Sequence, residues 1–198
     1  MKQQLRKHVI KRHTNETKID LAFAVDGSGQ SVIKTGIAFF DHMLDLFTKH
    51  GLFDLQLTVD GDLDVDFHHS VEDVGICLGQ AFHHAMGDCQ SIVRFSDVTL
   101  PMDDSLSQCV IDVSNRPYLK FNAVFSHAKV GQFDTELVQE FFQAFVNNAR
   151  INLHLNLHEG TNVHHQIEAC FKAFAVSLDR ATRIDVRKKG IPSTKGVL

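Results

Sequence analysis

The chain has few of the residues that mark several common classes of protein. Its 198 residues include no tryptophan, one tyrosine and three prolines, and the other aromatic residues are 16 phenylalanines. Because phenylalanine carries no polar group, this set favours a dry core over a surface that stacks sugars or nucleic-acid bases. A chain of this length buries enough surface to fold without cross-links, as one large domain or two small ones.

An excess of positive charge is also missing. The chain has 20 Lys and Arg residues against 24 Asp and Glu residues, which gives a net charge of −4 at pH 7. Neither nucleic acid nor anionic lipid is therefore an expected partner. The longest stretch without a charged residue, 74–87, has 14 residues, whereas a membrane-spanning helix needs roughly 20. We expect no association with a membrane.

The cysteines form no C-x-x-C pair; they are Cys77, Cys89, Cys109 and Cys170. Three of them have apolar neighbours, which favours buried free thiols over metal ligands or nucleophiles. The basic segment 1–12 lacks the apolar core of a secretory signal. The free thiols and the lack of a secretory signal both predict a protein of the cytoplasm.

Histidine is the residue in excess, with 13 copies. Four of them lie in a motif that occurs twice, H-H-x-x-E, at residues 68–72 and 164–168. Small and apolar residues follow both copies at helical spacing, so each motif is predicted to lie on a helix. Residues three and four apart share a helix face, which places each Glu beside both histidines of its copy.

The two copies supply four imidazoles and two carboxylates without a thiolate. This donor set favours Mn, Fe, Ni or Zn over a structural thiolate zinc site. Three acidic residues before the first copy, Asp62, Asp64 and Asp66, are candidates to orient the histidine rings. His42 and Glu140 occupy matching positions on a second pair of predicted helices, which makes both of them candidate ligands.

The duplication extends beyond the motif. Alternating strands are predicted at 18–25 and 118–125 and at 52–59 and 151–157, and helices with a Phe-Phe pair at 38–44 and 137–143. Each half, roughly 1–92 and 93–185, then has the order strand, strand, helix, strand, strand, helix. This order predicts an α+β fold with helices on one face of a mixed sheet. No Pro/Ser/Gly-rich linker divides the halves, so we expect a single domain over 1–198 with a basic tail at 186–198.

Taken together, these segments resemble the imidazoleglycerol-phosphate dehydratase family over essentially the whole chain. The matching stretches, in order, are 14–17, 35–44, 64–75, 94–96, 101–104, 112–117, 164–168 with 171–173, and 192–197. Another family would have to reproduce eight separated motifs in the same order.

The resemblance implies an internally duplicated fold in which each half is a four-stranded mixed sheet with two helices. It also implies a homo-oligomer of 24 subunits built from trimers, with active sites at subunit interfaces and two Mn²⁺ ions per site. Carried over residue by residue, one ion takes His42, His69, His164 and Glu168. The other ion takes His68, Glu72, Glu140 and His165.

Four positions depart from the residues usual in the family. Position 140 is Glu where many members carry His, and a carboxylate can still bind Mn²⁺ with a different affinity and metal preference. Phe67 stands where an Asp usually precedes the His pair, which leaves Asp66 as the acceptor there. Asn115 replaces a usual Gly and Thr194 a usual Ser, and both changes look tolerable.

The family's reaction is the dehydration of D-erythro-imidazoleglycerol phosphate to imidazoleacetol phosphate in L-histidine biosynthesis. The resemblance implies that metal ions stabilise the substrate's imidazolate, which expels the C3 hydroxyl and gives a diazafulvene with an acidic C2 proton. Glu16 is the candidate catalytic acid and base, and His50 is a candidate to assist it. The residues assigned to the substrate phosphate are Arg94, Arg116, Lys172, Ser193, Thr194 and Lys195.

Two other classes of function use similar residues. A di-metal hydrolase also pairs metals with carboxylates, but its ligands would be mainly carboxylates, one of them bridging. A metal-buffering or metal-assembled structural protein would need neither Glu16 nor the phosphate-binding residues. A Glu16→Gln variant separates these classes, because only the dehydratase should lose turnover of imidazoleglycerol phosphate while keeping metal and assembly.

Overall fold

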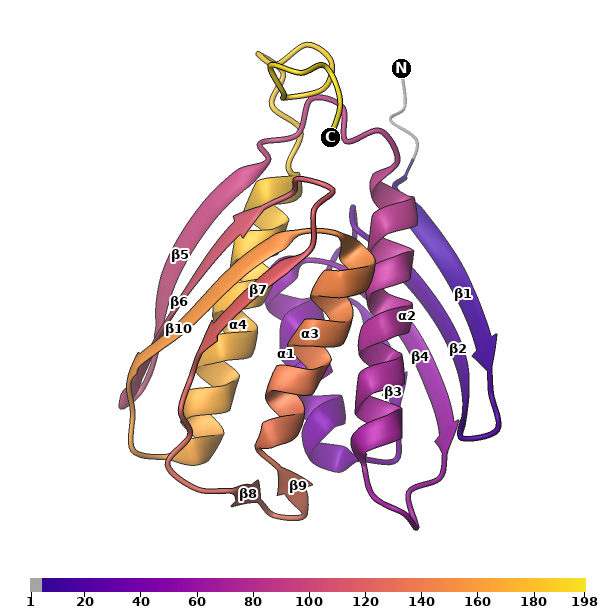
Figure 1. Cartoon of the computed structure of the whole chain (residues 1–198), viewed down its shortest axis with the longest axis vertical. Helices are drawn as coiled ribbons and strands as arrows, with labels where there is room; N and C mark the ends of the chain where they lie inside the picture. The colour runs from indigo at the N-terminus through magenta and orange to yellow at the C-terminus, as the bar shows by residue number, and fades with distance from the viewer. Residues whose placement is uncertain (1–4) are drawn as a thin grey trace.

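Two four-stranded sheets form the outer layers of the molecule, and four long helices fill the space between them (Figure 1). The structure is a computed structural model that describes residues 5–198. None of the helices in that range combines the length and apolar character that crossing a membrane requires.

The two halves of the chain repeat one topology. The first half contains β1 (Lys7–His13), β2 (Thr17–Ala24), β3 (Ser31–Lys34), α1 (Ala38–Gly51), β4 (Asp54–Gly61) and α2 (His68–Met86). The second contains β5 (Phe95–Met102), β6 (Ser105–Asp112), β7 (Tyr118–Asn122), the short pair β8 (Lys129–Val130) and β9 (Phe133–Asp134), α3 (Glu136–Ala149), β10 (Asn152–Glu159) and α4 (Val163–Thr182). The sheet orders are β1-β2-β4-β3 and β5-β6-β10-β7, each with one parallel pair at its edge. The predicted duplicated α+β fold with mixed sheets is confirmed.

The predicted order of elements within each half was wrong. Three strands of the main sheet precede the first long helix of each half, with the short pair β8 and β9 added in the second half, and one strand lies between the two helices, instead of two and two. The predicted match of 18–25 with 118–125 was also wrong, because the first lies in the inner strand β2 and the second in the edge strand β7, whose counterpart is β3. Alternating burial indicates that a strand is half-buried, but it does not indicate its place in the sheet.

The helices pair across the halves: α1 packs against α4, and α2 packs against α3. Phenylalanine fills the space between them, and ten of the 16 phenylalanines are less than 2% exposed. Phe142, for example, contacts the rings of Phe171 and Phe174 with centroids 5.1 and 5.2 Å apart. The predicted dry aromatic core therefore holds the four helices together.

Both H-H-x-x-E motifs lie at the start of a helix. Asp66 accepts a hydrogen bond from the backbone N–H of His68 at 2.7 Å, and Asn162 accepts one from that of His164 at 2.9 Å. These side chains satisfy backbone donors in the first turn and so set where α2 and α4 begin. Figure 1 shows both helix starts at the end of the molecule away from the C-terminal tail.

Candidate metal centre and phosphate pocket

Three predicted ligands meet where α1 packs against the start of α4. His42, His164 and Glu168 each offer one ligand atom, and these atoms all lie within 4.8 Å of one another. The Glu168 Oε2 atom is 3.7 Å from His42 Nε2 and 3.3 Å from His164 Nε2. Glu168 is 6% exposed, whereas His42 is exposed to solvent. The three side chains thus form a pocket of donors that is open on one side.

Lys172 forms an ion pair with the carboxylate of this cluster. Its Nζ atom lies 2.5 Å from Glu168 Oε1, one helical turn further along α4. Burial by itself raises the pKa of Glu168, but the hydrogen bond and charge of Lys172, together with His42 and His164, outweigh it and lower that pKa. Glu168 is therefore held as a carboxylate, the form that binds a metal.

His69 belongs to a second group, at the start of α2. Its Nδ1 donates to Asp62 at 2.9 Å, while its Nε2 lies 3.8 Å from Glu16 Oε1. The pKa of His69 is raised, first by the hydrogen bond to Asp62 and also by the nearby charge of Glu16. A carboxylate that fixes Nδ1 leaves Nε2 directed outwards, as in many metal-binding histidines. The structure thus assigns Asp62 the ring-orienting role predicted from the sequence.

His165 has the same arrangement at the start of α4. Its Nδ1 donates to Asp104 at 2.6 Å, and its Nε2 lies 3.9 Å from Asp103 Oδ2. The backbone N–H groups of Asn162 and Thr161 also donate to Asp104, and these bonds hold its pKa far below the usual range. Sequence reasoning did not single out Asp104. Its turn between β5 and β6 corresponds to the turn that carries Glu16 between β1 and β2, so the duplication was the available signal.

The remaining predicted ligands do not come together. Within residues 5–198 the His42 group is the one set of three donors at metal-binding distances, so His68, Glu72 and Glu140 form no second set. His68 and Glu72 lie on α2, and Glu140 lies on α3, which packs against it. His69 and His165 do not belong to the His42 group of donors, and each is hydrogen-bonded to its own carboxylate, Asp62 and Asp104.

The donors present fit a metal that binds nitrogen and oxygen, such as Mn, Fe, Ni or Zn. The His42 cluster offers two imidazoles and one charged carboxylate without a thiolate. The described cysteines are free thiols, and burial raises the pKa of Cys77 to about 11 and that of Cys170 to about 12. Such protonated, buried thiols are poor ligands and poor nucleophiles.

Five of the six predicted phosphate-binding residues line one cavity of about 500 Å³; they are Arg94, Arg116, Ser193, Thr194 and Lys195. Arg94 donates to Asp112 at 2.7 Å through Nε and to the Pro192 carbonyl at 2.8 Å through Nη1. This arginine therefore ties the C-terminal tail to the second sheet. The sixth residue, Lys172, does not line the cavity and lies beside Glu168 instead.

His50, the second candidate for catalysis, lies near the His42 cluster rather than near the phosphate cavity. Its pKa is lowered, first by partial burial and then by the positive charge of Lys172. A neutral imidazole is therefore favoured there, which can either donate or accept a hydrogen bond.

The His42 cluster and the cavity lined by the predicted phosphate-binding residues lie at opposite ends of α4. The backbone N–H of Arg94 donates to the carbonyl of Ala181, near the end of the helix, whereas His164 lies in its first turn. A helix rises 1.5 Å per residue, so these two positions are about 25 Å apart along the axis. One chain therefore does not place its own phosphate cavity beside its own ligand cluster.

Comparison with known proteins gives a consistent result. The family model for imidazoleglycerol-phosphate dehydratase matches residues 35–178. The imidazoleglycerol-phosphate dehydratase of Bacillus subtilis (strain 168) is 58% identical over 194 residues, which cover 98% of this chain and 100% of that protein. The enzyme of the same name from Trichlorobacter lovleyi is 57% identical over 189 residues, which cover 96% of this chain and 97% of that protein.

Two solved structures have the same fold as this chain. The imidazoleglycerol-phosphate dehydratase of Staphylococcus aureus subsp. aureus N315 matches with a TM-score of 0.83 and 42% identity, over 90% of this chain and 99% of that one. The Pyrococcus furiosus protein, solved in complex with (S)-C348, matches with a TM-score of 0.82 and 33% identity, over 96% and 100%. The chain therefore belongs to the imidazoleglycerol-phosphate dehydratase family and is an enzyme of the hydro-lyase class.

Proposed function

We propose that this chain catalyses the metal-dependent dehydration of D-erythro-imidazoleglycerol phosphate to imidazoleacetol phosphate, a step of L-histidine biosynthesis in the cytoplasm. The observation that carries the proposal is the His42, His164 and Glu168 cluster, built from the duplicated motif in a chain of this family. The cavity lined by Arg94, Arg116 and the tail supplies the cations and hydroxyls that a phosphate group requires.

Two sets of residues would hold two Mn²⁺ ions. His42, His164 and Glu168 would share one ion with His69, and His68, Glu72 and Glu140 would share the other with His165. When bound, the ions would act as Lewis acids on the two imidazole nitrogens of the substrate and stabilise the deprotonated ring. Asp62 and Asp104 fix the Nδ1 atoms of His69 and His165, so each imidazole presents Nε2.

Glu16 is the residue placed to move the substrate proton. It is exposed, and its Oε1 atom lies 3.8 Å from the Nε2 atom that His69 would offer to a metal. A carboxylate at that position lies within reach of a group bound beside His69 and can exchange a proton with its C2 atom. The neutral His50 would serve as a hydrogen-bonding partner for the substrate hydroxyls at the other side of the site.

The active site would be shared between copies of the chain. About 25 Å of α4 separates the ligand cluster from the phosphate cavity, whereas the substrate is a single imidazole joined to a three-carbon phosphate. A complete site then requires the ligand cluster of one copy and the phosphate cavity of another. This requirement supports a homo-oligomer with active sites at the interfaces between copies, and the family resemblance implies that it has 24 subunits built from trimers.

The proposal is tested by a dehydratase assay and metal analysis on purified protein, with and without the substitution Glu16→Gln. We expect the parent to contain Mn²⁺ and to form imidazoleacetol phosphate without releasing inorganic phosphate. Removal of a general acid and base lowers turnover by about 10²- to 10⁴-fold. Metal content and particle size should be unchanged in the variant, because Glu16 is not among the proposed ligands.

The matched control is Asp60→Asn, which removes an exposed carboxylate that pairs with Lys18 at 3.2 Å and lies outside the site. It should keep the parent's turnover. If Glu16→Gln also kept the parent's turnover, the assignment of Glu16 would be wrong. Release of inorganic phosphate from the substrate by the parent would instead indicate a di-metal hydrolase.

A further inference from the structure

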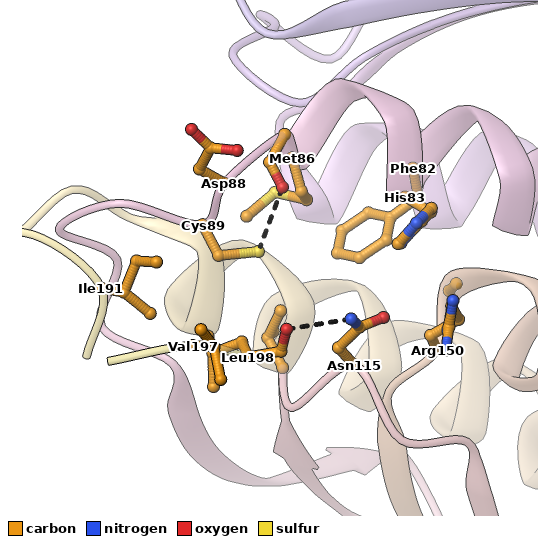
Figure 2. Close-up of a pocket in the computed structure, with 13 residues that line it drawn as sticks. Phe82, His83, Met86, Asp88, Cys89, Asn115, Arg150, Ile191, Val197 and Leu198 are labelled. Atoms are coloured by element: carbon orange, nitrogen blue, oxygen red, sulfur yellow. Dashed lines mark hydrogen bonds between the residues drawn. The ribbon is translucent and has the colours of Figure 1, made fainter. Parts of the chain in front are cut away.

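Asn115, in the turn after β6, adopts a backbone conformation that favours glycine. Its φ angle is +57°, in the left-handed region, which asparagine tolerates better than most residues with a side chain. The side chain turns towards the C-terminal tail, and its Nδ2 atom donates to the main-chain oxygen of Leu198 at 2.9 Å (Figure 2). Its Oδ1 atom is buried and has no hydrogen-bond partner within the described residues. The bond to Leu198 is thus the polar contact that this amide makes.

The end of the tail lies against an apolar cavity. The cavity has a volume of about 330 Å³, and its walls include Phe82, Met86 and Val113 together with Ile191 and Val197 of the tail. Figure 2 shows Val197 and Leu198 beside Asn115, with the end of α2 above them. Val197 also lines the phosphate cavity. One tail residue therefore lines both cavities.

The phosphate-binding part of the tail is held at both ends. At its start the Pro192 carbonyl accepts a hydrogen bond from Arg94 at 2.8 Å. Between the ends the backbone N–H of Gly196 donates to the Ser193 carbonyl at 3.1 Å, and that of Lys195 donates to Ser193 Oγ at 3.2 Å, which closes a tight turn. At its far end the bond from Asn115 to Leu198 is the second attachment.

We propose that Asn115 is a positioning residue for the phosphate site. Its amide holds the end of the tail, so that Ser193 and Lys195 stay beside Arg94 and Arg116 before the substrate arrives. A glycine at this position would adopt the same φ angle with less strain but would supply no donor. This proposal rests on the proposed function only for the identity of the phosphate ligand. The attachment of the tail to Asn115 does not depend on that identity, and it is measured separately by the rate of cleavage in the tail.

The test uses two variants of the full-length protein, Asn115→Gly and Asn115→Asp. Asn115→Gly suits the left-handed backbone, and Asn115→Asp keeps the side-chain shape while replacing the donor with an acceptor. Loss of one hydrogen bond lowers the equilibrium constant for attachment of the tail by about fivefold, so the detached fraction of a mostly attached tail rises about fivefold. We therefore expect trypsin to cleave after Lys195 about fivefold faster in both variants. Cleavage after the exposed Lys129 in β8 should be unchanged and serves as the internal control.

The same variants are measured with substrate and with inorganic phosphate as a probe. KM and the phosphate inhibition constant should rise by less than fivefold, because they follow the attached fraction of the tail, which falls by less than the detached fraction rises. The kcat value should stay within twofold of the parent, because Asn115 organises the site without touching the reacting atoms. Saturating inorganic phosphate should slow cleavage after Lys195, because it binds the attached tail. The control Asn122→Ala, which removes a side-chain bond to Asn156 on the second sheet, should change none of these values.

Unchanged cleavage after Lys195 in both variants would overturn the attachment. Cleavage after Lys195 that saturating inorganic phosphate did not slow would overturn the positioning role. If the parent itself neither turned over the substrate nor bound phosphate, the proposed function would fail. The cleavage rates would still decide whether Asn115 holds the tail.

Discussion

At the scale of single residues, one ion pair fastens the start of the first sheet to the helical layer. Arg6 donates to Asp26 through Nε at 2.9 Å and through Nη2 at 2.5 Å, and its Nη1 donates to the Thr182 carbonyl at the end of α4. The hydrogen bond from Arg6 is the largest cause of the lowered pKa of Asp26. Because the pKa of Asp26 in the folded state lies below its ordinary value of 3.8, the pair stabilises the fold at neutral pH. That stability is lost as the pH falls through the folded pKa.

Replacing Asp26 with Asn should therefore destabilise the protein in a pH-dependent way. We expect a loss of about 1–2 kcal/mol at pH 7, since hydrogen bonds to charged groups contribute more than neutral ones and this pair is partly exposed. The difference between parent and variant should shrink as the pH is lowered below 3.8. Unfolding midpoints at a fixed protein concentration, measured from pH 7 to pH 3, give the comparison. A constant difference over that range would show that the charge of Asp26 is not the cause.

Individual site residues differed in how far the sequence could predict them. The repeat of the motif 96 residues later made His164 and Glu168 candidate ligands, and the matching helix position made His42 one; the structure brings the three together. Asp104 lies in the matching stretch 101–104, but its role was missed because it depends on the approach of His165 from α4, which the turn sequence does not indicate. Lys172 was assigned to the phosphate, yet its contact with Glu168 depends on side-chain directions that spacing does not specify.

At the scale of elements, two glycines allow α2 and α3 to approach closely. A Cβ atom at Gly79 would lie 2.6 Å from the Phe145 carbonyl oxygen and 2.9 Å from the Ala149 nitrogen. One at Gly75 would lie 2.8 Å from both the Phe141 carbonyl oxygen and the Ala144 Cβ atom. Since these neighbours are mainly backbone atoms, the helices themselves would have to move apart to admit a methyl group.

Gly79→Ala should for that reason destabilise the protein, although alanine is the better helix former by about 1 kcal/mol. Overpacking a tight interface costs typically 1–3 kcal/mol, and here the backbone must shift, so we expect a net loss of about 2 kcal/mol. Chemical unfolding at a fixed protein concentration measures it. Gln143→Ala, on α3 with a side chain bonded to Asn147, is the control and should stay within about 0.5 kcal/mol. Stabilisation by Gly79→Ala would mean that helix propensity outweighs close packing here.

The helices could be predicted from sequence patterns, but the order of the strands in each sheet could not. Hydrophobic periodicity predicted all four long helices, because each buries one face against a partner over three or more turns. The strand order was not predictable in the same way. Strands β3 and β7 join their sheets in parallel beside β4 and β10, through connections that carry a helix, and alternation within a strand does not indicate its neighbour.

At the scale of the whole molecule, the two functional regions lie apart. The cluster of His42, His164 and Glu168 lies at the start of α4, and the phosphate cavity lies beside its end. Glu16 belongs with the first region, since it lies beside His69 at the end of the molecule that carries the helix starts. The sequence could predict both sets of residues through the family resemblance, but no pattern along one chain could reveal that the fold holds them about 25 Å apart.

A mixing experiment decides whether the site is shared between copies. Chains carrying Glu16→Gln and chains carrying Lys195→Ala should each be nearly inactive alone. When they are co-assembled in equal amounts, a site that draws Glu16 and Lys195 from different copies has both residues intact in about one quarter of cases. We expect about one quarter of the parent's kcat/KM, measured at substrate concentrations well below KM on particles that contain both chains, because loss of a phosphate contact appears in kcat/KM.

The double variant, co-assembled with the parent in equal amounts, separates the two geometries. If the two residues come from different copies, the mixture retains about one quarter of the parent's activity, as the first mixture does. If both come from one copy, this mixture retains about one half and the first mixture regains nothing. Because both mixtures hold the same number of Glu16→Gln and Lys195→Ala substitutions, a difference between them reports only on which copies meet at the site. The 25 Å separation along α4 predicts that the two mixtures have the same activity.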